Sequence, residues 1–176
     1  MKKRTKHNFD TAIIIALGSN LRGAYASSAA LLDAALAHLP KIGVTVAARS
    51  AWWRSAAWPH ATDPDYRNGV ALVETALQPR ALMAALLSAE TAFGRRRDAP
   101  NGPRTLDLDL IAYGRQTIAE DGVILPHPRA ADRRFVMGPL AQIAPTWTHP
   151  ISGATAAALA ESATVGRDAA PLAVGT

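Results

Sequence analysis

Residues 94–113 read GRRRDAPNGPRTLDLDLIAY, and they join the end of a helix, a basic loop and the start of a strand. The second half of this stretch alternates leucine with aspartate, which is typical of a β-strand whose successive side chains point to opposite faces. Asp107 and Asp109 are two residues apart, so we expect their carboxylates to lie side by side on one face. Two such carboxylates repel each other unless a cation lies between them.

Four arginines lie just ahead of these carboxylates in the chain. They are Arg95, Arg96, Arg97 and Arg104. Guanidinium groups match phosphate oxygens, and Mg²⁺ is commonly held by one or two carboxylates together with substrate phosphates. A solvated acidic edge beside a basic loop is the alternative. Because the two charge clusters adjoin, the sequence favours a phosphoryl-transfer site with a divalent cation.

The composition of the 176-residue chain limits the kinds of protein it can be. A hydrophobic fraction of 49% is enough for a packed core and argues against disorder. The chain has no cysteine, which fits a reducing compartment and excludes thiolate metal sites. No apolar run reaches the roughly 18 residues of a membrane span, and no signal-type apolar region follows the basic start. We therefore expect a cytoplasmic protein without a membrane partner, whose net charge of +5 suits an anionic ligand.

The length predicts one domain, which we place at residues 11–163. Residues 1–10 are basic and predict a flexible extension. Residues 164–176 are small and polar and predict a weakly ordered tail. No heptad or exposed apolar stripe indicates an assembly, so we expect a monomer and leave a dimer open.

Apolar periodicity and turn residues divide the domain into strands and helices. The expected strands are residues 12–17, 44–54, 66–75 and 107–113, and the expected helices are residues 27–39, 79–93, 134–143 and 154–162. The first six elements follow the order βαββαβ. This order predicts a ferredoxin-like α/β (α+β) sandwich, in which helices cover one face of an antiparallel sheet.

Several short motifs occur in a fixed order along the chain. They are Leu17-Gly18-Ser19-Asn20, Tyr66-x-Asn68, Glu90-x-x-x-Gly94-Arg95-x-Arg97, residues 102–109, Pro126-His127-Pro128, Arg133-x-Phe135-Val136 and Pro139-Leu140. In this order the chain resembles the 6-hydroxymethyl-7,8-dihydropterin pyrophosphokinase family, over about residues 13–145. The resemblance implies a ferredoxin-like fold and a step of folate biosynthesis. In that step, pyrophosphate passes from ATP to the hydroxymethyl group of the pterin, AMP is released, and two Mg²⁺ ions are needed.

The resemblance assigns the charged residues to metal and nucleotide. Asp107 and Asp109 would hold both Mg²⁺ ions. Arg95 and Arg104 would clamp the phosphates and neutralise charge during the transfer, so these four are the implied catalytic residues. The further contacts with ATP that it implies come from Glu90, Arg97, His127 and Arg133.

The resemblance also assigns a pterin pocket. Tyr66 and Phe135 would stack on the two faces of the flat ring. Asn68 offers one acceptor and two donors, which suits the amide and amino edge of a pterin and would set specificity. Ser55 and Trp58 lie in the loop that lines this pocket in the family.

One departure from the family concerns the loop before Gly102. The family often has a tryptophan directly before this glycine, in a loop that folds over bound ATP, whereas this chain has Asn101. An asparagine seals a site against water less well than a tryptophan, so we expect altered closure.

Two other functions fit parts of the sequence. A non-catalytic pterin or nucleotide binder on the same scaffold would explain the altered loop, but the retained aspartates and arginines argue against it. A basic ferredoxin-like module could bind RNA through aromatic residues on its sheet. Trp52 and Trp53 are adjacent, so one of them is expected to face away from the core. However, no Gly-Phe-x-Phe-like signature is present and paired aspartates repel phosphate, so we expect no nucleic-acid partner.

Overall fold

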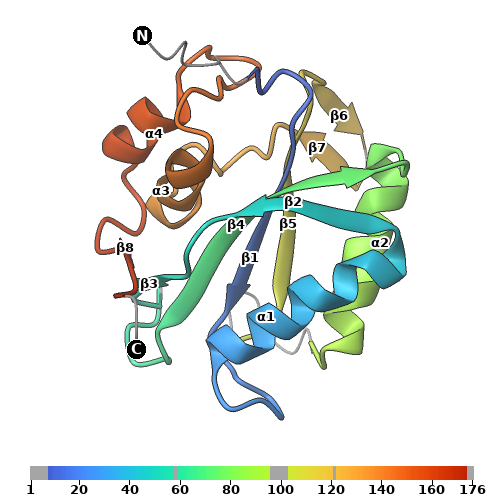
Figure 1. Ribbon diagram of the computed structural model, residues 1–176. Coiled ribbons are helices and arrows are strands. Elements are labelled where there is room, and N and C mark those ends of the chain that lie inside the picture. Colours follow the sequence, from blue (N-terminus) through green and yellow to red (C-terminus); the bar gives the residue numbers. More distant parts are fainter. Residues whose placement is uncertain (1–7, 58, 96–102, 121, 174–176) are drawn as a thin grey trace, which may run out of the picture.

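The computed structural model describes residues 8–57, 59–95, 103–120 and 122–173, and in these residues a six-stranded sheet forms the central layer (Figure 1). Its strands are β1 (Ile13–Ser19), β2 (Val44–Arg49), β3 (Trp53–Ser55), β4 (Tyr66–Thr75), β5 (Asp107–Tyr113) and β8 (Ala170–Pro171). A separate hairpin consists of β6 (Ile118–Glu120) and β7 (Val123–Leu125). The helices are α1 (Ser28–His38), the 3₁₀ helix η1 (Leu39–Ile42), α2 (Pro79–Ala92), α3 (Arg134–Ile143) and α4 (Ala156–Ser162). Among the described residues, no helix combines the length and the apolar character needed to cross a membrane.

The strands of the sheet are antiparallel and do not follow chain order. β1 lies between β4 and β5, and both β2 and β3 pair with β4. One register line crosses the sheet: Gly18 of β1 lies opposite Asp107 of β5 and opposite Asn68 of β4. Asn68 in turn lies opposite Trp53 of β3. Directly opposed residues share a face, so this line brings polar side chains from distant segments together.

Helices cover both faces of the sheet, and not one face as the sequence predicted (Figure 1). α1 and α2 pack on one face, over a core that includes Ile15 and Leu86. α3 and α4 cover the other face, over a core that includes Ile14 and Met137. β1 is buried along its whole length because its alternate side chains enter the two cores. This explains why residues 12–17 form an uninterrupted apolar run.

The two adjacent tryptophans confirm that both faces are covered. Trp52 belongs to the core beneath α1 and α2, and its Nε1 donates to Oδ1 of Asp33 at 3.0 Å. Trp53 packs against α3, where a Cβ built on Gly138 would lie 2.5 Å from the indole ring. Its Nε1 donates to Oε1 of Gln142 at 3.3 Å. The expectation that one tryptophan faces away from the core is wrong, which removes the exposed ring on which the RNA-binding hypothesis depends.

Local signals set the ends of the two helices on the first face. α1 begins after Ser27, whose Oγ accepts the amide hydrogen of Ala30 at 3.0 Å. α2 begins with Pro79, a residue suited to the first helical position. It stops before Gly94, whose φ of +80° ends the helix as predicted. The end of α2 places Arg95 next to the start of β5.

Two regions differ from the expected strands. The expected strand at residues 44–54 is broken into β2 and β3 at Ser50, whose Oγ accepts the amide hydrogen of Val70 at 3.0 Å. Residues 118–120 and 123–125, for which the sequence predicted no element, pair as β6 and β7. Each hairpin strand has three residues, which is too short for an alternating pattern to be recognised.

Residues 164–173 have more defined partners than their composition predicts. β8 pairs with β3 through Trp53 and Arg54. The amides of Thr164 and Val165 donate to the carbonyl oxygen of Asp132 at 3.1 and 2.9 Å. Most of these contacts are made by backbone groups, which every residue type but proline supplies in full, so composition does not reveal them.

The contact between Gly138 and Trp53 predicts an unusual sign for a glycine-to-alanine change. In an open helix position, such a change stabilises a protein by about 1 kcal/mol. We expect Gly138→Ala instead to lower the free energy of unfolding by about 1–3 kcal/mol, because the new methyl group overlaps the indole ring. Urea denaturation measures the difference, and a stabilised variant would contradict this packing.

Candidate active site

The candidate site lies on the sheet face that α3 covers, at one end of the strands. Along β5, the side chains on this face change from the buried Ile111 to the partly exposed Asp109 and Asp107. Along β4, they change in the same direction from the buried Val70 to the partly exposed Tyr66. The apolar core beneath α3 therefore gives way to polar and aromatic groups at this end of the sheet.

Asp107 is the centre of a network of ion pairs. Its Oδ1 accepts from Nη1 of Arg95 at 2.8 Å, and its Oδ2 accepts from Nη1 of Arg104 at 3.0 Å. Arg95 also pairs with Glu90, which is 2% exposed and whose Oε1 accepts the amide hydrogen of Leu108 at 2.8 Å. Burial raises the pKa of Glu90, although the Leu108 amide and Arg95 oppose this rise. Glu90 therefore holds Arg95 against the start of β5.

Asp109 follows on the same face of the strand. Burial, and then repulsion by Asp107, raise its pKa to about 6, although the charge of Arg133 opposes this rise. The two carboxylates offer oxygen donors on one face, which is the donor set that a hard divalent cation prefers. The described residues contain no cluster of three or more His, Asp or Glu side chains that could hold a metal by itself. Mg²⁺ fits this pair, provided that ligand oxygens complete its coordination shell.

Asn20 connects three loops next to this network. It is 4% exposed, its Oδ1 accepts the amide hydrogen of Arg104 at 2.8 Å, and its Nδ2 donates to the carbonyl oxygen of Pro64 at 3.0 Å. The carbonyl oxygen of Arg104 accepts in return from the amides of Asn20 and Leu21, both at 3.2 Å. Asn20 thus fixes the loop that carries Arg104 beside the segment that leads into Tyr66. Asn20 was recognisable from the sequence only as part of a motif, because these partners are distant in the chain.

Ser55 and Asn68 form a buried hydrogen-bonded pair on the same face. Nδ2 of Asn68 donates to Oγ of Ser55 at 2.9 Å. Gly18 lies between Asn68 and Asp107 in the register of the sheet. A Cβ built on Gly18 would lie 3.2 Å from Oδ1 of Asn68 and 3.9 Å from Cβ of Asp107. The glycine therefore leaves room between the amide and the carboxylate.

Phe135 lies in the first turn of α3, on the opposite side of the site from α2. Its ring packs on the backbone of Gly166, where a Cβ would lie 2.5 Å from Cδ1 of the ring. The guanidinium carbon of Arg133 lies 5.7 Å from the ring centroid. Tyr66, on β4, is partly buried, and this burial raises the pKa of its hydroxyl.

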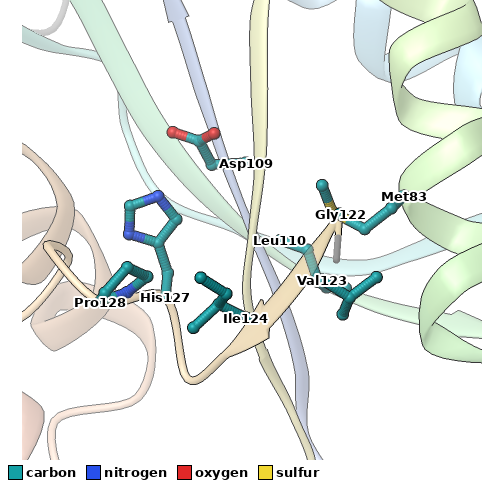
Figure 2. A pocket seen from close by; sticks show the side chains of 8 residues that line it. All are labelled: Met83, Asp109, Leu110, Gly122, Val123, Ile124, His127 and Pro128. Carbon is teal, nitrogen blue, oxygen red and sulfur yellow. The ribbon is translucent and has the colours of Figure 1, made fainter. Parts of the chain in front are cut away.

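A pocket of about 250 Å³ lies beside Asp109, between α2, β5 and the β6–β7 hairpin (Figure 2). Its lining residues are Met83, Asp109, Leu110, Gly122, Val123, Ile124, His127 and Pro128. Figure 2 shows Asp109 and His127 together on one side, with Met83 and Val123 across the pocket. Asp109 and His127 were predicted as site residues from the sequence, whereas the apolar wall was not, because the hairpin carries no recognisable strand pattern.

His127 is held against β5 and is neutral at neutral pH. Its amide donates to the carbonyl oxygen of Ile111 at 2.9 Å. Burial lowers the pKa of the imidazole to about 4, and the charges of Arg133 and Arg129 add to this effect. Nδ1 accepts the amide hydrogen of Arg129 at 3.2 Å. In the neutral tautomer that this bond requires, Nε2 carries the proton and acts as a donor.

The structure brings most of the residues predicted from the sequence to one end of the sheet. The charged group comprises Glu90, Arg95, Arg104, Asp107, Asp109, His127 and Arg133. The second group comprises Ser55, Tyr66, Asn68 and Phe135. Trp58, Arg96, Arg97 and Asn101 lie outside the described residues. The roles of all these site residues stay predictions.

In phosphoryl transfer, a protein accelerates the reaction mainly by positioning the reactants and by stabilising negative charge, and it takes little part in covalent steps. The arginines, the carboxylate pair and the pocket beside them meet these requirements on a mixed α/β scaffold. Fold and site together put the chain in the class of nucleotide-dependent transferases.

The chain belongs to the family of 7,8-dihydro-6-hydroxymethylpterin-pyrophosphokinase (HPPK), which matches residues 14–145. It is 44% identical over 131 residues to the 2-amino-4-hydroxy-6-hydroxymethyldihydropteridine pyrophosphokinase of Synechocystis sp., covering 74% of this chain and 67% of the relative. It is 37% identical over 136 residues to the protein of the same name from Methylorubrum extorquens, covering 77% and 84%. The resemblance inferred from the motifs is thereby confirmed.

A solved structure supports the fold. The wild-type HPPK-DHPS of Plasmodium falciparum superposes with a TM-score of 0.65 at 11% identity, over 85% of this chain and 44% of that chain. This chain thus spans less than half of that protein, and at this identity the likeness concerns the fold alone.

The lowered pKa of His127 predicts a pH-dependent loss of stability. Between pH about 4 and the ordinary value of 6.5, the unfolded chain binds a proton at His127 that the folded protein does not. Stability is therefore lost as the pH falls through this window. We expect the wild type to lose more free energy of unfolding between about pH 7 and about pH 5 than a His127→Gln variant.

Urea denaturation at the two pH values measures this difference. His60→Gln, which removes an exposed imidazole, serves as the control and should behave as the wild type. Equal losses in the wild type and in His127→Gln would contradict a buried, neutral His127.

Proposed function

We propose that this chain transfers pyrophosphate from ATP to the hydroxymethyl group of 6-hydroxymethyl-7,8-dihydropterin and releases AMP, a step of folate biosynthesis. The observation that carries the proposal is the pairing of Arg95 and Arg104 with Asp107, beside Asp109 on the same strand face. Membership of the pyrophosphokinase family supports the same reaction.

Asp107 and Asp109 are the residues that would hold Mg²⁺, as two ions in our proposal, and bound Mg²⁺ supplies charge neutralisation between the phosphates. Arg95 and Arg104 lie within hydrogen-bond distance of Asp107. On binding of the nucleotide, the two guanidinium groups exchange carboxylate oxygens for phosphate oxygens. Each arginine thus has an anionic partner both before and after this exchange. Arg97 and Arg133 are further phosphate contacts in this proposal.

The base of ATP would occupy the pocket beside Asp109. Met83, Val123 and Ile124 give this pocket apolar walls, and its volume of about 250 Å³ suits a single base. His127 lies at the polar side of the pocket, toward Asp109. Because its imidazole is neutral with Nε2 protonated, it donates a hydrogen bond toward the phosphates without adding a full charge.

The pterin would lie on the other side of the carboxylates. Tyr66 and Phe135 would stack on its ring, while Asn68, oriented by Ser55, reads its polar edge. The space that Gly18 leaves between Asn68 and Asp107 brings the hydroxymethyl group next to the phosphates. Trp58 is a further pterin contact, and Asn101 belongs to a lid over ATP, in this proposal.

We also assign the core to the ferredoxin-like class. α1 joins β1 to β2 with β4 lying between these strands, and α2 joins β4 to β5 with β1 lying between them. Two such split βαβ units make up this class of sandwich. β3, β8 and the α3–α4 layer are additions to it.

The protein acts in the cytoplasm as a monomer in this proposal. The absence of cysteine fits a reducing compartment. Among the described residues, the exposed large hydrophobic side chains are Leu21, Leu87, Ile124 and Ile151. They come from separate segments, and scattered exposed side chains of this kind do not mark an interface.

The proposal predicts that AMP forms from ATP only when the dihydropterin and Mg²⁺ are both present. We expect Asp109→Ala to lower kcat/KM by about 10²-fold or more, because the cation loses one of its two carboxylates. Asp10→Ala, which removes an exposed carboxylate from the segment before β1, is the matched control and should retain activity. Chromatographic separation of AMP, ADP and the pterin product measures the reaction. ADP in place of AMP, or pterin binding without any product, would contradict the proposal.

A further inference from the structure

The C-terminal segment, residues 164–172, lies outside the part of the chain that matches the family, yet it contacts both sides of the proposed pterin pocket. One side of the pocket is the start of α3, which carries Phe135. The other side is the end of β3, which carries Ser55. These two sides come from parts of the chain that are 80 residues apart, so a connection between them affects the width of the pocket.

On the α3 side, the segment fixes the residues that lead into the helix. The amide of Val165 donates to the carbonyl oxygen of Asp132 at 2.9 Å, and the amide of Arg134 donates to the carbonyl oxygen of Val165 at 2.9 Å. Gly166 follows with a φ of +69°, and the ring of Phe135 packs directly on its backbone. Only glycine meets both conditions, because a side chain here is strained and would overlap the ring.

On the β3 side, the segment adds an edge strand and a carboxylate. Ala170 and Pro171 of β8 pair with β3. The carboxylate of Asp168 accepts the amide hydrogen of Ala56 through Oδ2 at 2.6 Å. Ala56 directly follows Ser55, which is buried and bonded to Asn68. A carboxylate acceptor makes a stronger bond to an amide than a neutral oxygen does, so Asp168 holds the chain where it leaves β3.

We infer that the C-terminal segment spans the pterin pocket and sets its width, and that Asp168 is a positioning residue for pterin binding. Asp168 acts through Ala56 on Ser55, and Gly166 acts on Phe135, so neither contacts the ligand. The inference rests on the proposed function in that it takes Ser55 and Phe135 to line the pterin pocket. ATP binding should not depend on Asp168, because the nucleotide pocket lies across β5 and is lined by other segments.

The test compares Asp168→Ala and Asp168→Asn with the wild type. Tryptophan fluorescence gives the dissociation constant of 6-hydroxymethyl-7,8-dihydropterin, and steady-state kinetics give the KM for ATP. We expect Asp168→Ala to weaken pterin binding about tenfold and to leave the KM for ATP within about twofold. Asp168→Asn keeps an acceptor oxygen, so pterin binding should recover to within about threefold of the wild type. Glu161→Ala removes an exposed carboxylate from the neighbouring α4 and is the matched control.

Hydrogen exchange of the Ala56 amide provides a second readout, and it should accelerate in Asp168→Ala alone. Unchanged pterin binding in Asp168→Ala would overturn the inference. A parallel loss of pterin binding, ATP binding and melting temperature would also overturn it, because that result indicates a general structural role. Pterin binding and amide exchange are measured without turnover, so they test this inference independently of the AMP assay. A wild type that forms no AMP would instead refute the proposed function.

Discussion

Repulsion between the carboxylates of Asp107 and Asp109 is the constraint on which the site depends. The alternation of β5 places both groups on one face, and partial burial of Asp109 disfavours its charged form. Arg95 and Arg104 offset the charge of Asp107, and Glu90 in turn fixes Arg95. Asp109 has no such ion pair among the described contacts, and burial and the charge of Asp107 both disfavour its charged form, so the arrangement favours function over stability.

The packing of helices on both faces of the sheet leaves the carboxylates of Asp107 and Asp109 at an end of the sheet that ligands can reach. β1 and β4 are buried between two helical layers for most of their length, and this fixes the positions of their ends. Along β4 and β5, the side chains on the face that α3 covers change from buried to partly exposed toward Tyr66 and Asp107, so the same sheet face is core at one end and candidate site at the other. A site built on strand ends is rigid, which suits a reaction governed by positioning.

The part of the site that depends on local sequence patterns was predictable from the sequence. The period of two in residues 106–110 placed Asp107 and Asp109 on one face, and the structure confirms it. The contacts of Asn20 and Asp168 were not predictable, because each joins segments 44 or more residues apart through polar atoms that leave no periodic pattern. The expectation that either Trp52 or Trp53 faces away from the core was wrong because only one face of the sheet was expected to be covered, although the apolar run at residues 12–17 is also typical of a strand buried on both faces.

The central claim is that the charged Asp109 destabilises the folded protein and is stabilised by a bound cation. Thermal denaturation of the wild type and of Asp109→Asn at about pH 8 tests it most directly. The pKa of Asp109 is raised to about 6, so at this pH the folded protein carries its unfavourable charged form. Without metal, we expect Asp109→Asn to have a melting temperature equal to or above that of the wild type. With Mg²⁺ and a non-hydrolysable ATP analogue, the melting temperature of the wild type should rise and that of the variant should not show this Mg²⁺-dependent rise. A variant that is less stable without metal, and that gains as much from Mg²⁺ as the wild type does, would contradict the account.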